Sequence, residues 1–600
     1  MNTPTFSHLL ARLWHHLSLR RRRQFGLLTG LMLVSAFAEV VSLGAVLPFL
    51  GILVAPDRVL SHPTVLNIAQ AWSITSADQL VLPLIVAFAA AALIAGAIRI
   101  LLLWASTRLA AVTGADISLQ VYRRTLYQPY QVHVARNTSE MISGITVKAN
   151  AVVFTVLLPL LTLVSSTVLL VFMTVTLIAI HPMAASLAAV GFGASYALIT
   201  RMCRRRLNRN SLQIAYQQTH VVKALQEGLG GIRDVLLDGT QPFYCNLYRQ
   251  ADLPLRLAQG SNGFLATSPR YIMEALGLML IAALTFILCL GAGGIATALP
   301  VLGALALGAQ RLLPALQQIY GAWASIVGSH DSLVDIIELI DQPLFGAALD
   351  ALPAPLYFHD AVRLDAVRFR YNSDGPWVLD GLNLTIAKGA RVGLVGSTGS
   401  GKSTTVDLLM GLLMPTEGQV LVDGQPTTGE RLRAWQRSIA HVPQSIYLAD
   451  ASMAENIAFG VAPQDIDLDR VKQAARQAQI ANFIESNPNG YQASVGERGI
   501  RLSGGQRQRV GIARALYKQA SVLVFDEATS ALDNVTEQSV MEAFDGVDRG
   551  ITILLIAHRL TTVRGCDTII ELEHGRVVVQ GTYEELLEIS PSFRRFAGAV

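Results

Sequence analysis

A glycine-rich loop between an apolar strand and a helix carries residues that could hold phosphate groups. Residues 396–403 fit the pattern G-x-x-x-x-G-K-[ST], with the apolar run 392–395 before them and a helix expected over 404–413. Backbone N–H groups of such a loop curl around phosphate oxygens, and the helix N-terminus adds partial positive charge. The pattern predicts that Lys402 reaches the outer phosphates and that Ser403 holds Mg²⁺. The expected contact residues are Gly396, Ser397, Thr398, Gly399, Ser400, Gly401, Lys402, Ser403 and Thr404.

Polar residues at the ends of three further apolar strands suit the hydrolysis of ATP. The strand SVLVF delivers Asp526, which suits Mg²⁺, and Glu527, which suits a general base that polarises water. Gln444 could contact Mg²⁺ and the attacking water, and His558 could donate to a γ-phosphate. Alone, the acidic pair could be a turn or a helix cap, and the glutamine and histidine could be structural. The complete phosphate loop upstream favours the catalytic interpretation.

A second anion-binding pattern follows in the segment LSGGQ, residues 502–506, before a helix expected over 507–516. Ser503, Gly504 and the helix N-terminus would present hydrogen-bond donors to an anion. One nucleotide needs only one phosphate cradle. Two cradles in one chain therefore suggest a composite site, in which this loop covers ATP held by another subunit. The residues assigned to this loop are Ser503, Gly504, Gly505 and Gln506.

Strand-like and helix-like segments alternate over residues 358–600, which predicts an α/β domain with ligands beyond the carboxyl ends of its strands. Residues 341–357 are expected to form a linker, because three prolines lie in this stretch and no membrane-helix periodicity is present.

The first part of the chain is expected to be a membrane domain over residues 1–340. Hydrophobic residues make up 52% of the 600-residue chain, charged residues only 15%, and the mean hydropathy is +0.43. The apolar share is above the average of soluble proteins and the charged share is below it. An amphipathic helix on the membrane surface is expected over 5–19. Six spans, each near the ~20 residues that cross a bilayer, are predicted at about 24–54, 79–108, 150–180, 183–201, 271–292 and 297–326.

The placement of positive charge sets the orientation. Lysines and arginines gather in 108–148 and 202–270, whereas the loops near 181 and 291–300 have none. The positive-inside rule then places both termini in the cytoplasm. Nucleic-acid binding by the cluster Arg20 to Arg23 is disfavoured, because a basic cluster next to an apolar span is better explained by cytoplasmic anchoring. The long cytoplasmic stretches predict helices that continue beyond the membrane, and a turn near 127–143 with Asn137 or Thr138 as a helix cap.

The order of these motifs resembles the ATP-binding domain of ABC transporters, and the likeness covers 358–600. The matching elements are Tyr371, GSTGSGKS, Gln444, LSGGQ, VLVFDE, SALD and His558. Six spans ahead of one such domain resemble an exporter-type half-transporter. The resemblance implies that Tyr371 stacks on adenine and that two chains enclose two ATP molecules. It favours a homodimer with two competent sites, because Glu527, LSGGQ and His558 are all present.

Three membrane segments resemble lipid-linked oligosaccharide flippases of the PglK type, which act in bacterial protein N-glycosylation. They are AEVVSLGAVLPF (38–49), SPRYIMEALG (268–277) and AQRLLPA (309–315). The resemblance implies a polyprenyl-diphosphate-linked oligosaccharide as cargo and a location in the bacterial inner membrane. Export of another lipid, a drug or a peptide is the alternative. A soluble ABC ATPase of repair or translation is excluded by the spans, and an ATP-gated receptor or channel is disfavoured by Glu527.

Three arginines lie in or next to the predicted spans. At about 1.5 Å per residue, Arg99 is expected at the cytoplasmic border, where Arg270 also lies, and snorkelling would satisfy both. Arg311 lies deeper and is expected to need a partner, either Glu39 or a diphosphate, which guanidinium groups bind well. In the resembling flippases, arginines line the cavity and engage the pyrophosphate of the lipid. Arg99, Arg270 and Arg311 are therefore hypothesised to guide the cargo.

Overall fold

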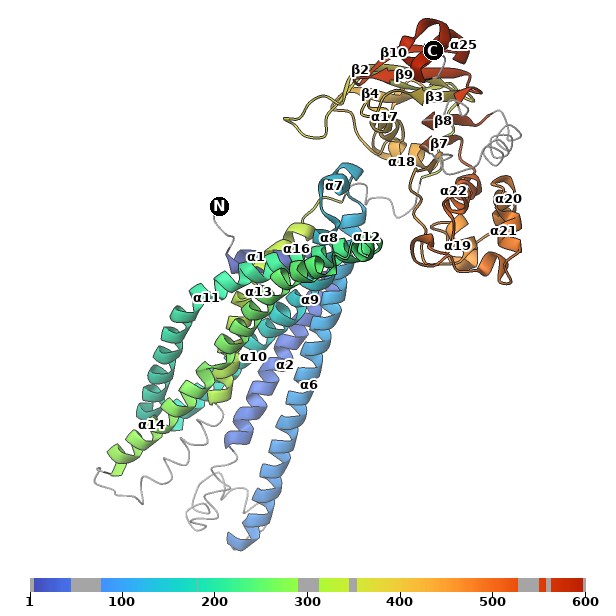
Figure 1. Cartoon of the computed structure of the whole chain (residues 1–600). Helices are drawn as coiled ribbons and strands as arrows, with labels where there is room; N and C mark the ends of the chain where they lie inside the picture. The colour runs from blue at the N-terminus through green and yellow to red at the C-terminus, as the bar shows by residue number, and fades with distance from the viewer. Residues whose placement is uncertain are drawn as a thin grey trace. The chain divides into compact units, whose positions relative to one another are not determined.

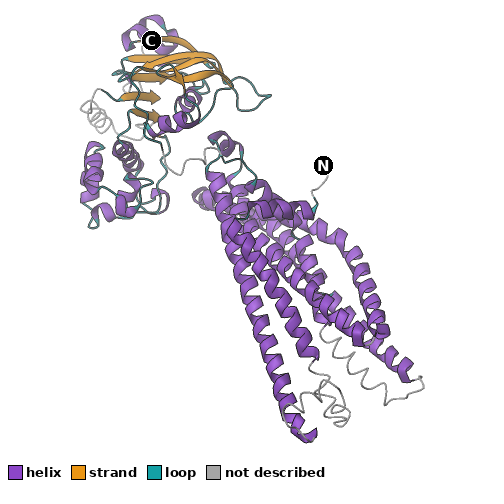
Figure 2. Cartoon of the chain, turned by 180° about the vertical axis from the view of Figure 1, so that it is seen from behind, coloured by secondary structure: helices purple, strands orange, loops and turns teal. Residues whose placement is uncertain are grey.

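The computed structural model describes the chain except for residues 1–4, 45–76, 181, 290–311, 345–352, 527–549, 557–562 and 597–600. The chain divides into two units (Figure 1). One, called the helical unit here, comprises Met1–Gln128 and Arg136–Leu344, and the other, the α/β unit, comprises Pro129–Ala135 and Phe345–Val600. Figure 2 shows strands in one unit and helices throughout the other. The predicted fold class, a helical membrane domain fused to an α/β domain, is confirmed.

Long helices make up the helical unit. Of two π-helical segments, η1 lies just before the third predicted span and η2 lies within it, and such segments often mark functional regions. The elements in chain order are α1 (Phe6–His16), α2 (Leu19–Gly44), α6 (Ala77–Leu126), α8 (Thr138–Ser143), η1 (Gly144–Lys148), α9 (Ala149–Ala151), η2 (Val152–Leu157), α10 (Leu158–Ile180), α11 (Pro182–Gly230), α12 (Ile232–Leu237), α13 (Gln241–Thr267), α14 (Pro269–Cys289), a helix over 312–327 and α16 (His330–Ile340).

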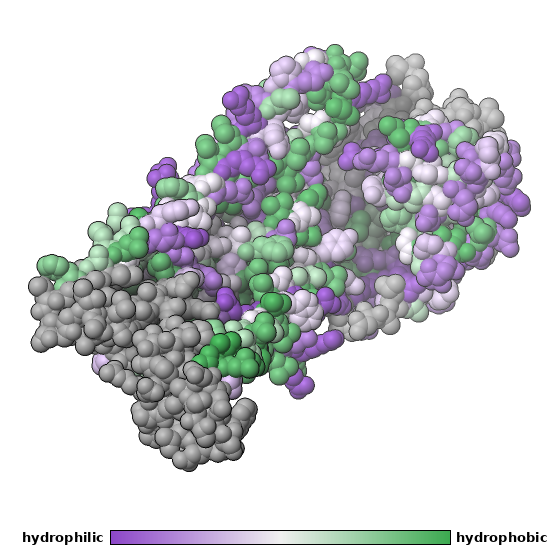
Figure 3. Space-filling model, turned by 90° about the horizontal axis from the view of Figure 1, so that it is seen from below, coloured by the Kyte–Doolittle hydropathy of each residue, from purple (hydrophilic) through white to green (hydrophobic). Residues whose placement is uncertain are grey.

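Helices cover predicted spans two to four and the described parts of spans one, five and six. Within the described residues, three helical stretches are long and apolar enough to cross a bilayer: Leu19–Ser42, Val81–Leu126 and Thr138–Ala179. The expected continuation of helices beyond the membrane is confirmed, because α6 has 50 residues and α11 has 49. Apolar side chains, green in Figure 3, lie on the exposed surface of these helices, as lipid contact requires.

The core of the helical unit forms where α1, α6, η2 and α16 meet. Leu9 and Leu13 of α1 are buried there together with Leu333 and Ile337 of α16. Polar contacts fix the end of α16: Arg12 and His16 of α1 pair with Asp341, and the Arg124 side chain donates to the carbonyl of Gln342 at 2.6 Å. The last helix of this unit is therefore held by the surface helix α1 at the point where the chain leaves for the α/β unit.

The expected cap near 137 is also present. The side chain of Asn137 accepts a hydrogen bond from the backbone N–H of Ser139 at 3.1 Å, which satisfies a free donor at the start of α8. The preceding short helix, α7 (Tyr130–Ala135), belongs by its contacts to the α/β unit.

Two sheets organise the α/β unit. The larger sheet has the order β10-β9-β3-β8-β7-β6, in which the five strands from β9 to β6 are parallel, and the smaller has the antiparallel order β2-β1-β4-β5. The strands are β1 (Ala361–Phe369), β2 (Leu379–Ala387), β3 (Arg391–Val395), β4 (Glu417–Val422), β5 (Gln425–Pro426), β6 (Ile439–Val442), β7 (Val522–Asp526), β8 (Thr552–Ile556), β9 (Thr568–Glu573) and β10 (Arg576–Gly581).

An apolar core joins the two sheets, and a second core joins the larger sheet to a group of helices. Val392 and Leu394 of β3 belong to the first core, and Leu523 and Phe525 of β7 to the second. Alternate residues of these strands thus face opposite sides, as a sheet covered on both faces requires. The helices are α17 (Lys402–Leu409), α18 (Gly429–Arg437), α19 (Met453–Ile457), α20 (Leu468–Gln477), α21 (Ala481–Glu485), α22 (Gly504–Lys518), α25 (Tyr583–Ile589) and α26 (Pro591–Phe596).

Candidate functional site

The predicted phosphate loop connects β3, a strand paired in parallel with β8 and β9, to α17. Its backbone needs glycine: Gly396 has a φ of 145°, and an added Cβ would lie 2.2 Å from the carbonyl oxygen of Leu572. Gly401, with a φ of 99°, precedes the first residue of α17. The helix ends at Leu409, four residues before the predicted end, because Gly411 takes a φ of 68°, the left-handed conformation that terminates helices.

The side chains of the loop fit a phosphate chain. Lys402 is 7% exposed, and its Nζ donates to the carbonyl oxygens of Gly396 and Ser397, each at 2.9 Å. Ser400 is 2% exposed, and its Oγ has no hydrogen-bond partner among the described residues. A buried hydroxyl without a partner is costly. Phosphate oxygens at this loop would satisfy it, so the loop fits the nucleotide that its sequence predicts.

The carboxyl ends of neighbouring strands bring the predicted metal-binding residues to the same edge of the sheet. Asp526 ends β7, which lies between β8 and β6, and Gln444 follows β6 by two residues. Ser403 lies exposed in the first turn of α17. A hydroxyl, a carboxylate and an amide oxygen are oxygen ligands of the kind that Mg²⁺ takes, so these three residues could hold the ion. Glu527 and His558 follow β7 and β8, but both lie outside the described residues.

An acidic residue that the sequence reasoning missed also belongs to this region. Burial, and then the negative charge of Asp526, raises the pKa of Asp407 to about 6. The two carboxyl groups therefore lie near enough to repel each other, and a cation held by Asp526 would relieve this repulsion. Asp407 is one helical turn after Ser403, and this spacing was the signal in the sequence that could have identified it.

Tyr371, expected to stack on adenine, lies two residues after β1 and is 41% exposed. Its ring meets the ring of Phe369 edge-on at 5.0 Å, and its hydroxyl lies 3.2 Å from Oγ1 of Thr404 in α17. Gln131 of α7 donates to the backbone carbonyl of Tyr371 at 3.5 Å. Burial raises the pKa of Tyr130 in the same helix, and the charges of Asp407 and Tyr371 add to this. The adenine-side residue and α7 are thus in contact.

The segment LSGGQ forms the exposed start of α22. The hydroxyl of Ser503 accepts from the backbone N–H of Gln506 at 3.2 Å, and the Gln506 side chain accepts from the backbone N–H of Ser503 at 2.8 Å. This capping box positions the helix N-terminus. Both Ser503 and Gly504 are exposed on the surface of the α/β unit, so they are available to a nucleotide outside their own phosphate loop.

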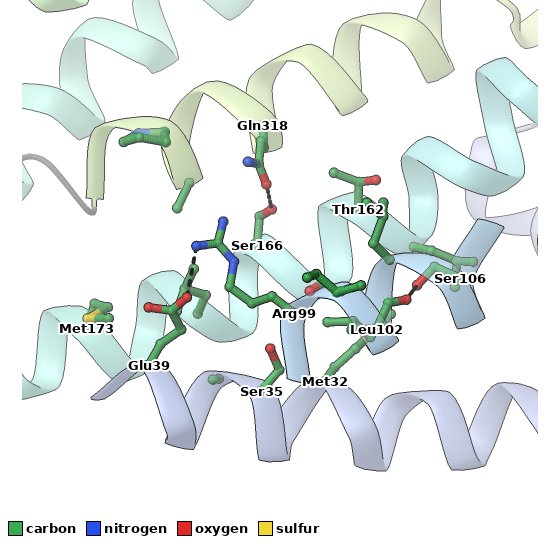
Figure 4. A pocket seen from close by; sticks show the side chains of 18 of the residues that line it. Met32, Ser35, Glu39, Arg99, Leu102, Ser106, Thr162, Ser166, Met173 and Gln318 are labelled. Atoms are coloured by element: carbon green, nitrogen blue, oxygen red, sulfur yellow. Dashed lines mark hydrogen bonds and ion pairs between the residues drawn. The ribbon is translucent and has the colours of Figure 1, made fainter. Parts of the chain in front are cut away.

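The helical unit contains a cavity of about 790 Å³. It lies among α2, α6, α10 and the helix over 312–327, and most of its lining is apolar. Nη1 of Arg99 from α6 lies 3.0 Å from Oε1 of Glu39 from α2 (Figure 4). On another wall, the hydroxyl of Ser166 donates to Gln318 Oε1 at 2.8 Å. The cavity thus combines an apolar wall with a few charged and hydrogen-bonding groups.

The three predicted cargo-binding arginines have different surroundings. Arg99 lines the cavity and has a protein partner there, because its Nη1 lies 3.0 Å from Oε1 of Glu39; its expected place at the cytoplasmic border stays a prediction. Arg270 pairs with Glu274 of its own helix at 2.8 Å, and among the described residues neither lines the cavity. Arg311 lies outside the described residues, so its expected contacts stay a prediction. Ser166 and Gln318 were missed by the sequence reasoning, although polar residues within apolar spans are a usable signal.

A nucleotide-binding α/β unit fused to membrane-crossing helices around a cavity defines an ATP-driven membrane transporter. Family models agree with this class: residues 379–530 match the model described as ABC transporter, and residues 59–295 match the ABC transporter transmembrane region. The chain is 31% identical over 481 residues to an ATP-dependent lipid A-core flippase of Cupriavidus pinatubonensis, a match that covers 78% of this chain and 79% of that protein. The chain therefore belongs to the ABC transporter family.

Two further comparisons extend this likeness. A protein of Saccharophagus degradans, also named ATP-dependent lipid A-core flippase, is 43% identical over 264 residues, which are 44% of each chain. A solved structure of a bacterial Atm1-family ABC exporter with ATP bound has a TM-score of 0.78 and 26% identity, and the match covers 97% of this chain and 98% of that one. The chain is an exporter-type half-transporter in which ATP hydrolysis drives transport across a membrane and the ATPase domain is cytoplasmic.

Proposed function

We propose that two copies of this chain form a homodimer that flips a polyprenyl-diphosphate-linked oligosaccharide across the bacterial inner membrane. The observation that carries the proposal is the cavity with Arg99 on an apolar wall. A lipid-linked oligosaccharide has an apolar chain, an anionic diphosphate and a polar glycan. The apolar wall suits the chain, the guanidinium suits the diphosphate, and groups such as Ser166 and Gln318 suit hydroxyls.

Two composite ATP sites would drive the movement. In each, Tyr371 and the loop 396–404 of one chain hold ATP, and Ser503 to Gln506 of the other chain cover it. Ser403, Gln444 and Asp526 would hold Mg²⁺, whose charge would offset that of the phosphates. Glu527 is the proposed general base that orients and polarises water, and His558 the proposed donor to the γ-phosphate. Lys402 exchanges its contacts with the loop carbonyls for phosphate oxygens.

A second candidate cargo is a lipid A-core molecule, because relatives that match this chain carry that name. Both candidate cargoes are lipids with large polar head groups. The measurement that separates them is flipping in liposomes containing the purified protein, with a panel of lipid-linked oligosaccharide, lipid A-core and a hydrophobic drug. Flipping of the first alone supports the proposal, and flipping of the second alone contradicts it.

Two sets of variants connect the cargo to the machinery. The E527Q variant should still bind ATP but should not flip the cargo. Its amide group, unlike the carboxylate of Glu527, cannot accept a proton from water. Replacing Arg99, Arg270 and Arg311 together with alanine should stop flipping while ATPase activity in detergent persists. Flipping at the wild-type rate by the triple variant would show that these arginines do not guide the cargo.

A further inference from the structure

The ion pair inside the membrane cavity joins two residues with opposite exposure. The Glu39 side chain is 4% exposed, whereas that of Arg99 is 56% exposed and lines the cavity. A carboxylate away from water is costly unless a cation compensates it. Glu39 therefore belongs to the wall, and Arg99 is the member of the pair that an entering molecule meets.

The contact with Glu39 also fixes the orientation of the Arg99 guanidinium. A guanidinium has five N–H donors in one plane, and the 3.0 Å contact to Glu39 uses one terminal nitrogen, Nη1. In Figure 4 the other terminal nitrogen is turned away from the Glu39 carboxylate. The Arg99 side chain is long and flexible, and without a partner its guanidinium would take several orientations. The Glu39 carboxylate holds the guanidinium in one of them.

The same carboxylate cancels the charge that it positions. A negative head group that approaches Arg99 also approaches Glu39, and in a cavity with mostly apolar walls both interactions are stronger than in water. Attraction by Arg99 is thus opposed by repulsion from Glu39. A transporter must release its cargo as well as bind it, and an intramolecular competitor for the cation lowers the affinity without removing the binding group.

We propose that Glu39 is a positioning residue that sets the affinity of the cavity for anionic head groups by holding Arg99 and competing for it. This inference rests on the proposed function, in which Arg99 meets the diphosphate of the cargo. It assigns to Glu39 a role that the sequence reasoning did not consider, since Glu39 was expected only as a structural partner of Arg311.

Farnesyl diphosphate and farnesol are suitable probes because they share an apolar chain and differ by the diphosphate. Their binding to the purified full-length protein is measured by equilibrium titration for wild type, E39Q, R99Q and E274Q. E274Q is the matched control, because Glu274 also pairs with an arginine, at 2.8 Å, but among the described residues it is not part of the cavity lining.

E39Q keeps an oxygen that accepts from Arg99 but removes the competing charge. It should bind farnesyl diphosphate roughly tenfold more tightly than wild type, with unchanged affinity for farnesol. R99Q should lose the preference for the diphosphate, and E274Q should behave as wild type. Equal or weaker binding of farnesyl diphosphate by E39Q would overturn the proposal and leave Glu39 a structural residue.

A transport measurement separates this proposal from the proposed function. In liposomes, E39Q should show a lower KM and a lower maximal rate for the lipid-linked oligosaccharide, because tighter binding slows release. If the wild type does not flip that lipid, the proposed cargo is wrong, yet the ratio of farnesyl diphosphate affinities still tests Glu39. If E39Q does not fold, E39D serves instead. The aspartate side chain is shorter, so it keeps the negative charge but loses the contact with Arg99. An affinity of E39D for farnesyl diphosphate equal to that of wild type would contradict the positioning role.

Discussion

The hydroxyl of Tyr371 lies 3.2 Å from Oγ1 of Thr404, so the residue expected to contact adenine is tied to the first turn of the helix expected to bind phosphate. The Tyr371 ring is also held edge-on by Phe369 at 5.0 Å, while 41% of the residue stays exposed. Both contacts leave part of the aromatic surface accessible. Tyr371 is therefore positioned from two sides and available for stacking on a base.

Exchanges at Tyr371 should separate the ring from the hydroxyl. Y371A should lower the affinity for ATP by roughly tenfold, since base–aromatic stacking contributes about 1–3 kcal/mol. Y371F should lower it only about twofold, because the ring and its contact with Phe369 remain and one neutral hydrogen bond contributes about 1 kcal/mol or less. Titration with a fluorescent ATP analogue measures both. An equal loss in the two variants would assign the effect to the hydroxyl and not to stacking.

A half-buried histidine in β6 should make stability sensitive to acid. Burial lowers the pKa of His441, in β6, below its ordinary value of 6.5. At pH 7 and above, the side chain is neutral in both the folded and unfolded states. As the pH falls below 6.5, the unfolded state takes up the proton before the folded state does, so the free energy of unfolding decreases. The stabilising difference is therefore present above pH 6.5 and is lost in acid.

H441V should reduce this acid sensitivity. Between pH 7 and pH 5, its thermal unfolding midpoint should fall by roughly 2 °C less than that of wild type. H359Q is the control, because His359 lies exposed in the same unit and its removal also takes away one imidazole. The same pH profile for H441V and wild type would contradict the role of burial.

The phosphate loop and the strand ends could be predicted because short segments of the sequence determine them. The apolar run of β3, the glycines at 396 and 401 and the start of α17 are local features, and each fits the pattern on which the prediction depends. The spacing of Asp407 from Ser403 could have been recognised, but its proximity to Asp526 could not, because that depends on the order of the strands in the larger sheet. Composition and charge likewise predicted the membrane helices and their continuation.

The pairing of charges inside the membrane could not be predicted in the same way. Glu39 was expected as one of two possible partners of Arg311, which lies outside the described residues, and its contact with Arg99 at 3.0 Å was not expected. Which charges meet depends on the rotation of α2 relative to α6 and on the level at which each helix crosses the membrane. Neither quantity follows from hydropathy, which gives the length of a span but not its facing residues.

The pairs of Asp341 should stabilise the junction between α1 and α16. Arg12 and His16 both contact this carboxylate. All three side chains are partly buried: Arg12 is 35% exposed, His16 22% and Asp341 29%. D341A should lower the thermal midpoint by roughly 2 °C, since a partly exposed ion pair contributes about 0.2–1 kcal/mol. The difference should shrink in about 0.5 M salt, because added salt screens charges that are partly exposed to solvent.

The control for Asp341 is D252A, which removes a pair with Arg256 within one helix at 3.1 Å. Pairs of this kind contribute about 0.3–0.5 kcal/mol, so this variant should unfold closer to wild type. If D341A and D252A have the same midpoint, the contacts at Asp341 do not stabilise the junction.

Mixed dimers should show whether Ser503 acts on the ATP of the partner chain. When one chain carries S503A and the other K402A, a composite arrangement leaves one site with both Lys402 and Ser503 intact, and the other site with both lesions. Hydrolysis should then remain measurable. When both substitutions lie in one chain and the other chain is wild type, every composite site has one lesion, and hydrolysis should fall to background. Sites built within single chains give the reverse pattern for the two dimers. The two dimers are prepared from differently tagged chains, purified through both tags and assayed for phosphate release. The reverse pattern would refute the composite site. The exposed capping box of Ser503 and Gln506 supports that site.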